Sequence, residues 1–447
     1  MMSIIFTKNL LFKIFKKVNK ILTKGGQLMK TRAVRIYGEN DLRLEEFELP
    51  EIKEDEILAR IVSNSICMST YKAVIQGGRH KRVPDDVAEN PTITGHEFAG
   101  EIVKVGKKWQ DQFEPGEKFA VQPALNYKGS PYAPGYSYKY FGGNTEYTII
   151  PQEVMELGYL LKYEGDGFYE ASLSEPMSCI VGGYHAVYHT ESNNYIHKMG
   201  IVEDGKVALL GAAGPMGLGA IDYALHADRK PSVVVVTDIN QDRLDRAASL
   251  FTQTEAEKQG VELHFVNTAE MDDVPAELKE LVGGEGYDDV FVYAPVRELA
   301  EQGDQILGKD GCMNFFAGPT DKELSAEFNL YNIHYSPTHI MGSTGGNDDD
   351  MRESLKLSAE GRLNPATMIT HVGGLDSAAD TIQNLPKIPG GKKLIYTSID
   401  MELTALADFA KKGEDNPKFA ELAEIIADNN GLWSAAAENY LLENFRK

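Results

Sequence analysis

Cysteines, basic residues and long apolar segments are all scarce in this sequence of 447 residues. Three cysteines, far apart at positions 67, 179 and 312, exclude a disulfide framework and suit the reducing cytoplasm. Lys and Arg total 45 against 67 Asp and Glu, and the resulting net charge of -22 repels phosphate backbones. No apolar run is long enough to cross a membrane. We therefore expect a cytoplasmic protein with no nucleic-acid partner and no membrane partner.

The first 28 residues are rich in lysine and contain no acidic residue. They cannot span a bilayer, although a basic amphipathic helix on an anionic membrane is physically possible. We favour the hypothesis that residues 1–28 are a non-native N-terminal extension. Lys24-Gly25-Gly26-Gln27-Leu28-Met29 is what translation of a purine-rich bacterial ribosome-binding site and a start codon would give. On this hypothesis the working protein begins at Met29.

Two hydrophobic patterns divide the rest of the chain. Up to about residue 150, short apolar runs separated by Gly and Pro predict strands over residues 33–36, 56–62, 98–105, 118–122 and 145–150. Further on, helical patterns such as 218–226 and 241–250 alternate with apolar runs at 207–210, 233–237, 262–266, 289–293, 312–317 and 339–342. That alternation predicts an α/β fold with a doubly wound parallel sheet.

A glycine-rich loop follows the first of these six runs. Its glycines allow a tight turn and close approach to a pyrophosphate, whose charge the N-terminus of the following helix receives. Asp238 ends the next strand, 21 residues after Gly217, where an acid binds the adenine ribose. The alternative is a plain glycine turn with a helix-capping Asp. The predicted dinucleotide contacts are Gly211, Ala212, Gly214, Pro215, Met216, Gly217, Asp238 and Arg243. Asp238 favours NAD, while Arg243 leaves NADP open.

Three further segments carry groups that bind zinc. Cys67 follows a strand, His96 and Glu97 open another, and Glu175 begins the helix that leads to the dinucleotide domain. A thiolate, an imidazole and a carboxylate suit zinc, and three protein ligands leave a fourth position for water or substrate. Taken singly, each residue is better explained as a buried cysteine, a core histidine or a helix-capping carboxylate, but together and in this chain order they favour a metal site.

These motifs together resemble the zinc-dependent medium-chain alcohol and polyol dehydrogenases. The resemblance rests on Cys67 with Ser69, on Gly95-His96-Glu97, on Glu175-Pro176 and on the loop from Gly211 to Gly217. Within that family, stretches such as Val83-Pro84-Asp85-Asp86 and Gly390-Gly391-Lys392-Lys393 resemble bacterial L-sorbose-1-phosphate reductases. The resemblance implies a reversible reaction between a ketose phosphate and a hexitol phosphate, such as L-sorbose 1-phosphate and D-glucitol 6-phosphate, with NAD(H) or NADP(H).

The resemblance also implies the domain arrangement. We expect a mainly-β, GroES-like catalytic domain over residues 29–185, with a doubly wound Rossmann domain over 186–344 inserted in it. Residues 345–400 return to the catalytic domain, and 401–447 form an acidic helical C-terminal extension, by default a solvated helical pair. We also expect a homo-oligomer.

In the implied site, Cys67 and His96 bind a single catalytic zinc with Glu97 or Glu175, and Ser69 passes a proton between the substrate oxygen and solvent. The segment 113–150 contains no cysteine, so the second, structural zinc of many relatives is excluded. Thr70 stands where the family usually has Asp. The carboxylate expected there must come from elsewhere or be missing.

A basic loop follows Ser69 in this otherwise acidic chain, with Lys72, Arg79, His80, Lys81 and Arg82. We predict that Lys72, Arg79 and Lys81 bind the phosphate of the substrate, the alternative being a solvated surface loop. Two rival functions stay open: a dehydrogenase of a neutral polyol or other secondary alcohol, and a non-enzymatic nucleotide-binding protein. The intact zinc ligands argue against the second.

Overall fold

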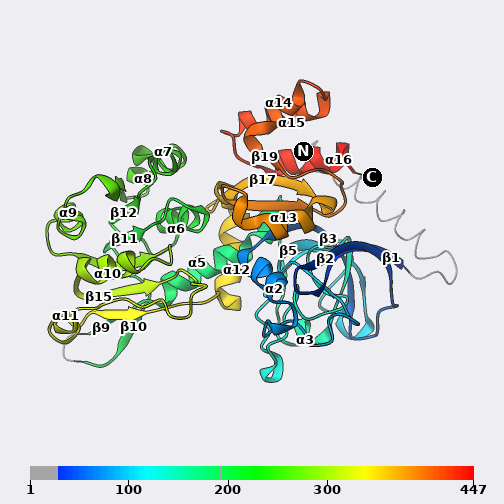
Figure 1. Ribbon diagram of the computed structural model, residues 1–447, viewed down its shortest axis with the longest axis horizontal. Helices are drawn as coiled ribbons and strands as arrows, with labels where there is room; N and C mark the ends of the chain where they lie inside the picture. Colours follow the sequence, from blue (N-terminus) through cyan, green and yellow to red (C-terminus); the bar gives the residue numbers. More distant parts are fainter. Residues whose placement is uncertain (1–28, 192–193, 447) are drawn as a thin grey trace.

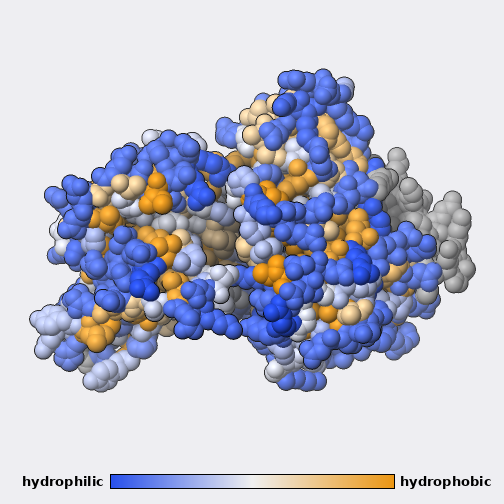
Figure 2. All heavy atoms as spheres, in the orientation of Figure 1, coloured by the Kyte–Doolittle hydropathy of each residue, from blue (hydrophilic) through white to orange (hydrophobic). Residues whose placement is uncertain are grey.

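The computed structural model describes residues 29–191 and 194–446, so the lysine-rich segment 1–28 lies outside the described residues. The chain forms two lobes joined by helices (Figure 1). On the face shown in Figure 2, the surface is hollowed between the lobes. Within the described ranges, no helix is long and apolar enough to cross a membrane.

The first lobe is built on an eight-stranded sheet in the order β19-β17-β18-β3-β5-β6-β8, with β7 paired to β3. A separate three-stranded sheet has the order β2-β1-β4. Strand β18 comes from the last quarter of the chain and pairs antiparallel with β3. The chain therefore leaves this lobe and returns to it. The strands are β1 (Met29–Gly38), β2 (Asp41–Leu49), β3 (Ile57–Ile66), β4 (Thr92–Ile93), β5 (Glu97–Val105), β6 (Lys118–Val121), β7 (Tyr147–Ile150), β8 (Leu160–Lys162), β17 (Ile369–Gly374), β18 (Lys392–Tyr396) and β19 (Thr404–Ala405).

The second lobe contains a six-stranded sheet in the order β13-β12-β11-β14-β15-β16, and all its strand pairs are parallel. In chain order this is the arrangement 3-2-1-4-5-6 of dinucleotide-binding folds. Runs such as Val207–Leu210 are fully buried, because helices cover both faces of a parallel sheet. The six predicted runs correspond to β11 (Lys206–Leu210), β12 (Val233–Asp238), β13 (Glu262–Asn267), β14 (Tyr287–Val292), β15 (Leu307–Phe315) and β16 (His339–Met341). The predicted fold class is confirmed.

Helix α5 (Ser174–Ala186) leads from the first lobe into the second, and α12 (Asp348–Ala359) packs against it (Figure 1). Glu175 lies in the first turn of α5, at the boundary between the lobes. The remaining α-helices are α2 (Met68–Gln76), α3 (Gln152–Glu156), α4 (Phe168–Ser172), α6 (Pro215–His226), α7 (Gln241–Leu250), α8 (Gln253–Lys258), α9 (Val274–Glu280), α10 (Arg297–Ile306), α11 (Leu330–Tyr335), α13 (Ala378–Asn384), α14 (Phe409–Gly413), α15 (Pro417–Asp428) and α16 (Ala435–Asn444).

Several strands have no counterpart among the sequence predictions. Between residues 345 and 400 the sequence has a single apolar run, at 393–398, which predicts one strand, yet β17 lies beside β18 there. The residues of β17, Ile-Thr-His-Val-Gly-Gly, give a weak strand signal because glycine and polar residues interrupt it. Strand β2 is mostly polar, and β9 (Tyr188–Thr190) and β10 (His197–Met199) form a short hairpin.

The C-terminal extension packs closely against the first lobe. Trp433 is fully buried, and its Nε1 donates a hydrogen bond to the hydroxyl of Tyr396 at 2.7 Å. Glu438, 1% exposed, accepts hydrogen bonds from that hydroxyl and from the backbone N–H groups of Phe168 and Tyr169. One face of the extension is therefore part of the main hydrophobic core.

Candidate active site

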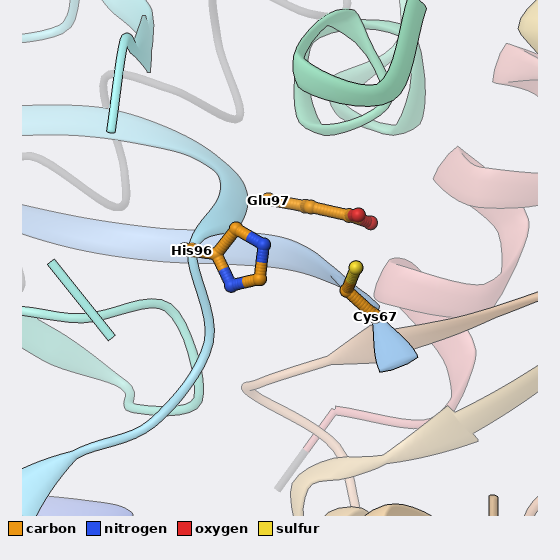
Figure 3. Close-up of side chains that lie close together, drawn as sticks. All are labelled: Cys67, His96 and Glu97. Atoms are coloured by element: carbon orange, nitrogen blue, oxygen red, sulfur yellow. The ribbon is translucent and has the colours of Figure 1, made fainter. Parts of the chain in front are cut away.

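Three side chains that could hold a metal ion lie together in the first lobe. Sγ of Cys67, a ring nitrogen of His96 and a carboxylate oxygen of Glu97 lie within 4.8 Å of one another (Figure 3). Cys67 is the N-cap of α2, directly after β3, and Glu97 is the first residue of β5. Among the described residues, this is the one group of at least three His, Cys, Asp or Glu side chains with such spacing.

The pairing of β3 with β5 brings these segments together. Ser65 lies opposite Glu97 in the antiparallel register, so the end of β3 delivers Cys67 beside the start of β5. Gly95 makes the turn into β5 with φ of +90°, a conformation that favours glycine. A Cβ atom at Gly95 would lie 2.7 Å from Oδ1 of Asn64, so the turn also needs glycine for space.

Hydroxyl groups contact both ring nitrogens of His96. Oγ1 of Thr70 lies 3.3 Å from Nδ1, and Oγ of Ser69 lies 3.2 Å from Nε2 and 3.0 Å from Sγ of Cys67. Thr70 thus contacts the imidazole from the position where the family usually has Asp. Burial lowers the pKa of His96, which favours the neutral ring that a metal requires.

Lys392 of β18 binds the carboxylate of Glu97. Its Nζ lies 2.6 and 2.8 Å from the two oxygens, and 9% of the Lys392 side chain and 1% of the Glu97 side chain are exposed. Burial alone would raise the pKa of Glu97, but the ammonium beside it holds this pKa below its usual value. No sequence signal connects the motif Gly390-Gly391-Lys392-Lys393 to the site.

Glu175, the other predicted carboxylate ligand, is not in the close cluster of Cys67, His96 and Glu97. Burial raises the pKa of Glu175 to about 7, and the negative charge of Glu97 adds to this while His96 opposes it. Its Oε1 lies 4.0 Å from Sγ of Cys179. The carboxylate of Glu175 is therefore close enough for the charges of the cluster to shift its pKa, but it is not part of the cluster.

The donor set fits a divalent cation. Cys67, Glu97 and Glu175 can carry three negative charges, and Lys392 supplies one positive charge. A dication would balance the remainder. Without a cation, burial raises the pKa of the Cys67 thiol and keeps it protonated, whereas a metal ligand is a thiolate. Thiolate, imidazole and carboxylate are the ligands that zinc accepts.

The predicted dinucleotide loop joins β11 to α6. Gly211 has φ of +64°, which glycine adopts without strain. A Cβ atom at Gly217 would lie 1.8 Å from the carbonyl oxygen of Ala212, so glycine allows the helix to pack closely on the loop. A Cβ atom at Gly214, the N-cap of α6, would meet nothing within 4 Å, and Pro215 begins the helix. The loop therefore has the glycine geometry of a pyrophosphate site.

Asp238 lies at the end of β12, beside this loop. Its Oδ2 accepts a hydrogen bond from the N–H of Ala213 at 3.3 Å, and its Oδ1 accepts one from the N–H of Asn240 at 3.0 Å. Arg243 is exposed in the first turn of α7. Asp238 therefore contacts the glycine loop through the backbone of Ala213.

The basic loop after Ser69 has a mixed environment. Arg79 pairs with Glu39 at 2.8 Å, and both side chains are more than half exposed. Lys81 is exposed, and Lys72 is partly exposed on α2. Arg82, which was not among the predicted phosphate contacts, lies over the ring of Tyr136.

Tyr136 is a further site residue that sequence reasoning missed. Its hydroxyl donates a hydrogen bond to Oγ of Ser69 at 3.0 Å, and its ring stacks with that of His96 at a centroid distance of 5.1 Å. It lies between residues 130 and 140 in an irregular segment with no catalytic motif, so the sequence offered no signal for it.

Comparisons with known proteins identify the family. Residues 53–158 match the alcohol dehydrogenase GroES-like domain, and residues 215–360 match the zinc-binding dehydrogenase family. The chain belongs to the zinc-binding medium-chain dehydrogenases. The sequence-based assignment to this family, and to oxidoreductases acting on CH–OH groups, is confirmed.

Two curated relatives match over nearly their whole length. Mannitol-1-phosphate 5-dehydrogenase of Aliivibrio fischeri is 54% identical over 93% of this chain and 98% of the relative. L-sorbose 1-phosphate reductase of Klebsiella pneumoniae is 45% identical with the same coverage. A Sinorhizobium meliloti protein solved with NADP and described as a zinc-binding dehydrogenase has 21% identity and a TM-score of 0.65, over 82% of this chain and 99% of that one. This last likeness shows the fold.

Proposed function

We propose that this protein is a zinc-dependent dehydrogenase that transfers hydride between NAD(P)H and the carbonyl carbon of a ketose phosphate, giving a hexitol phosphate. The observation that carries the proposal is the cluster of Cys67, His96 and Glu97 in a chain that matches two sugar-phosphate enzymes over nearly its whole length. One relative is named for a hexitol phosphate and the other for a ketose phosphate. Those compounds are the two sides of one type of reaction.

Cys67, His96 and a glutamate would hold one zinc ion per chain. The bound ion supplies a Lewis acid for the substrate oxygen, and the nicotinamide supplies the hydride. The third ligand is Glu97 or Glu175. Glu97 lies in the cluster, and Lys392 keeps it ionised. This supports Glu97 as the ligand and Glu175 as a neighbour that acts directly or through water.

Ser69 would carry the proton that the substrate oxygen gains or loses. Its hydroxyl can donate and accept at the same time. The hydroxyl of Tyr136 donates to Oγ of Ser69, which leaves the Ser69 proton free to point toward Cys67 or the substrate. In the reducing direction the carbonyl carbon thus receives a hydride from the cofactor, and the substrate oxygen receives a proton through Ser69.

The dinucleotide would lie along the loop from Gly211 to Gly217, with its pyrophosphate at the N-terminus of α6. Ala212, Gly214, Pro215 and Met216 complete this loop. Asp238 would bind the adenine ribose hydroxyls and repel a 2'-phosphate, which favours NAD over NADP. Arg243 at the start of α7 offers a cation that could accept that phosphate instead.

Mannitol 1-phosphate is the first candidate substrate because the relative named for it has the higher identity, 54% against 45%. L-sorbose 1-phosphate and D-glucitol 6-phosphate, which the sequence motifs favour, form the second candidate pair. A homo-oligomer with one zinc ion per protomer completes the proposal.

A spectrophotometric assay of the zinc-loaded protein tests this function. Mannitol 1-phosphate and D-glucitol 6-phosphate are offered with NAD or NADP, each beside the matching free hexitol. We expect one phosphate ester to be oxidised far more efficiently than either free hexitol. Preferential oxidation of a free hexitol would support the neutral-polyol alternative. Nucleotide binding without turnover of any alcohol would support the non-enzymatic one.

A further inference from the structure

The substrate class proposed above carries a dianionic phosphate, and the chain around it has a net charge of -22. The ammonium of Lys392 is bound to both oxygens of Glu97 and is not free for another anion. A sugar phosphate therefore needs a separate cation near the reacting centre.

Arg82 is such a cation. Its Cζ lies 5.4 Å from the centroid of the Tyr136 ring, and that ring stacks with His96 while its hydroxyl donates to Ser69. Arg82 is thus connected to the catalytic residues through a single aromatic side chain.

Hydrogen bonds at both the N–H and the C=O group of Arg82 fix the backbone position from which its side chain extends. Its carbonyl oxygen accepts a hydrogen bond from Oγ of Ser137 at 2.5 Å, and its N–H donates to Nδ1 of His80 at 3.3 Å. The ring of His80 stacks with that of Tyr136 at 5.6 Å. Tyr136 is 1% exposed, so the surface on which Arg82 rests is part of the rigid core.

Within the described part of the chain, the guanidinium of Arg82 lies over the ring of Tyr136 and has no carboxylate partner, while His80 and Ser137 bind only the Arg82 backbone. The neighbouring Arg79, in contrast, is paired with Glu39. An unpaired guanidinium held beside a catalytic centre can form two parallel hydrogen bonds to phosphate oxygens.

We propose that Arg82, positioned by the ring of Tyr136, binds the phosphate group of the substrate and selects phosphorylated over free sugars. This inference rests on the proposed function, because it takes a sugar phosphate as the substrate. It moves the centre of the phosphate site from the predicted Lys72, Arg79 and Lys81 to the last residue of the same basic loop.

The proposal is tested by steady-state kinetics of two variants, Arg82→Ala and Arg82→Lys. The substrates are mannitol 1-phosphate, D-glucitol 6-phosphate and the free hexitols. For Arg82→Ala we expect kcat/KM on the phosphate ester to fall about 10- to 100-fold more than on the free hexitol, mainly through a higher KM. Arg82→Lys keeps a positive charge without the planar fork and should recover part of the loss. Inorganic phosphate should inhibit the unmodified enzyme competitively and Arg82→Ala at least about 10-fold less strongly.

Arg43→Ala is the matched control. The guanidinium of Arg43 also lies over a tyrosine ring, 4.1 Å from the centroid of Tyr37, but it pairs with Asp41 on the polar strand β2. Equal losses on phosphorylated and free hexitols in Arg82→Ala, with unchanged phosphate inhibition, would overturn the role of Arg82. If the unmodified enzyme does not prefer the phosphate ester, the proposed function fails instead. The two failures are therefore distinguishable.

Discussion

Lys392 donates hydrogen bonds to both carboxylate oxygens of Glu97, at 2.6 and 2.8 Å, beside the thiol and imidazole of the metal-binding cluster. Both side chains are buried, and they come from positions 295 residues apart in the sequence. The pair connects the returning strand β18 to the start of β5, so it joins the two segments of the first lobe at the site itself.

Lys392→Met should therefore destabilise the protein strongly. The variant leaves the carboxylate of Glu97 buried without its counter-ion, a change that costs about 3–5 kcal/mol. Denaturant unfolding with a chelator present, so that no metal ion neutralises Glu97, measures the difference. Adding Glu97→Gln to Lys392→Met removes the unpaired charge and should recover part of the loss. A single variant as stable as the unmodified protein would show that the pair is not important for the fold.

Thr70 contacts Nδ1 of His96, the ring nitrogen on the other side from Ser69. If this hydroxyl orients the imidazole, Thr70→Ala should weaken zinc binding about 10- to 100-fold, as loss of an outer hydrogen bond does in other metal sites. Thr70→Ser keeps the hydroxyl and serves as the control. Competition with a chelator of known affinity measures both. Equal zinc affinities in the two variants would mean that the hydroxyl has no such role.

Asp238 should set the preference for NAD. In Asp238→Ala, the ribose acceptor and the repulsion of a 2'-phosphate disappear together, so the ratio of NAD to NADP efficiency should fall about 10- to 100-fold. The neighbouring exposed acid Asp242, in the first turn of α7, provides the control variant Asp242→Ala. A ratio that is unchanged in Asp238→Ala would place the cofactor preference at another residue.

Glu438 should make stability depend on pH. Burial raises its pKa to about 7 in the folded state from the ordinary value of 4.5, so the folded protein holds this proton more tightly than the unfolded chain. The resulting stabilisation is fully present below the unfolded pKa and is lost as pH rises through about 7, an effect of about 1–3 kcal/mol. Thermal unfolding across this pH range measures it.

Glu438→Gln cannot ionise, so its stability should change less between pH about 5 and about 8 than that of the unmodified protein. Glu424→Gln, at an exposed position of α15, is the matched control and should keep the original slope. Identical slopes in all three proteins would show that Glu438 does not titrate in this range.

The local parts of this structure were predictable, and the long-range contacts were not. Helix α7 has the bounds that the sequence predicts, and the glycine loop lies between β11 and α6 as expected, because both follow from periodicity and turn chemistry over short segments. Cys67, His96 and Glu97 were predictable because they lie next to recognisable strands. Lys392 and Tyr136 were not, since strand pairing and a loop crossing bring them to the site from far along the chain.

The central claim is tested most directly by the efficiency with which the zinc-loaded enzyme and Cys67→Ala oxidise each hexitol phosphate and its free hexitol. The pairs are mannitol 1-phosphate with mannitol, and D-glucitol 6-phosphate with glucitol. For the unmodified enzyme we predict about one zinc ion per chain and efficient oxidation of at least one phosphate ester. Cys67→Ala should bind no zinc and oxidise none of the substrates, but it should still bind the dinucleotide. Full activity of Cys67→Ala, or equal efficiency on the free and phosphorylated hexitols, would contradict the account.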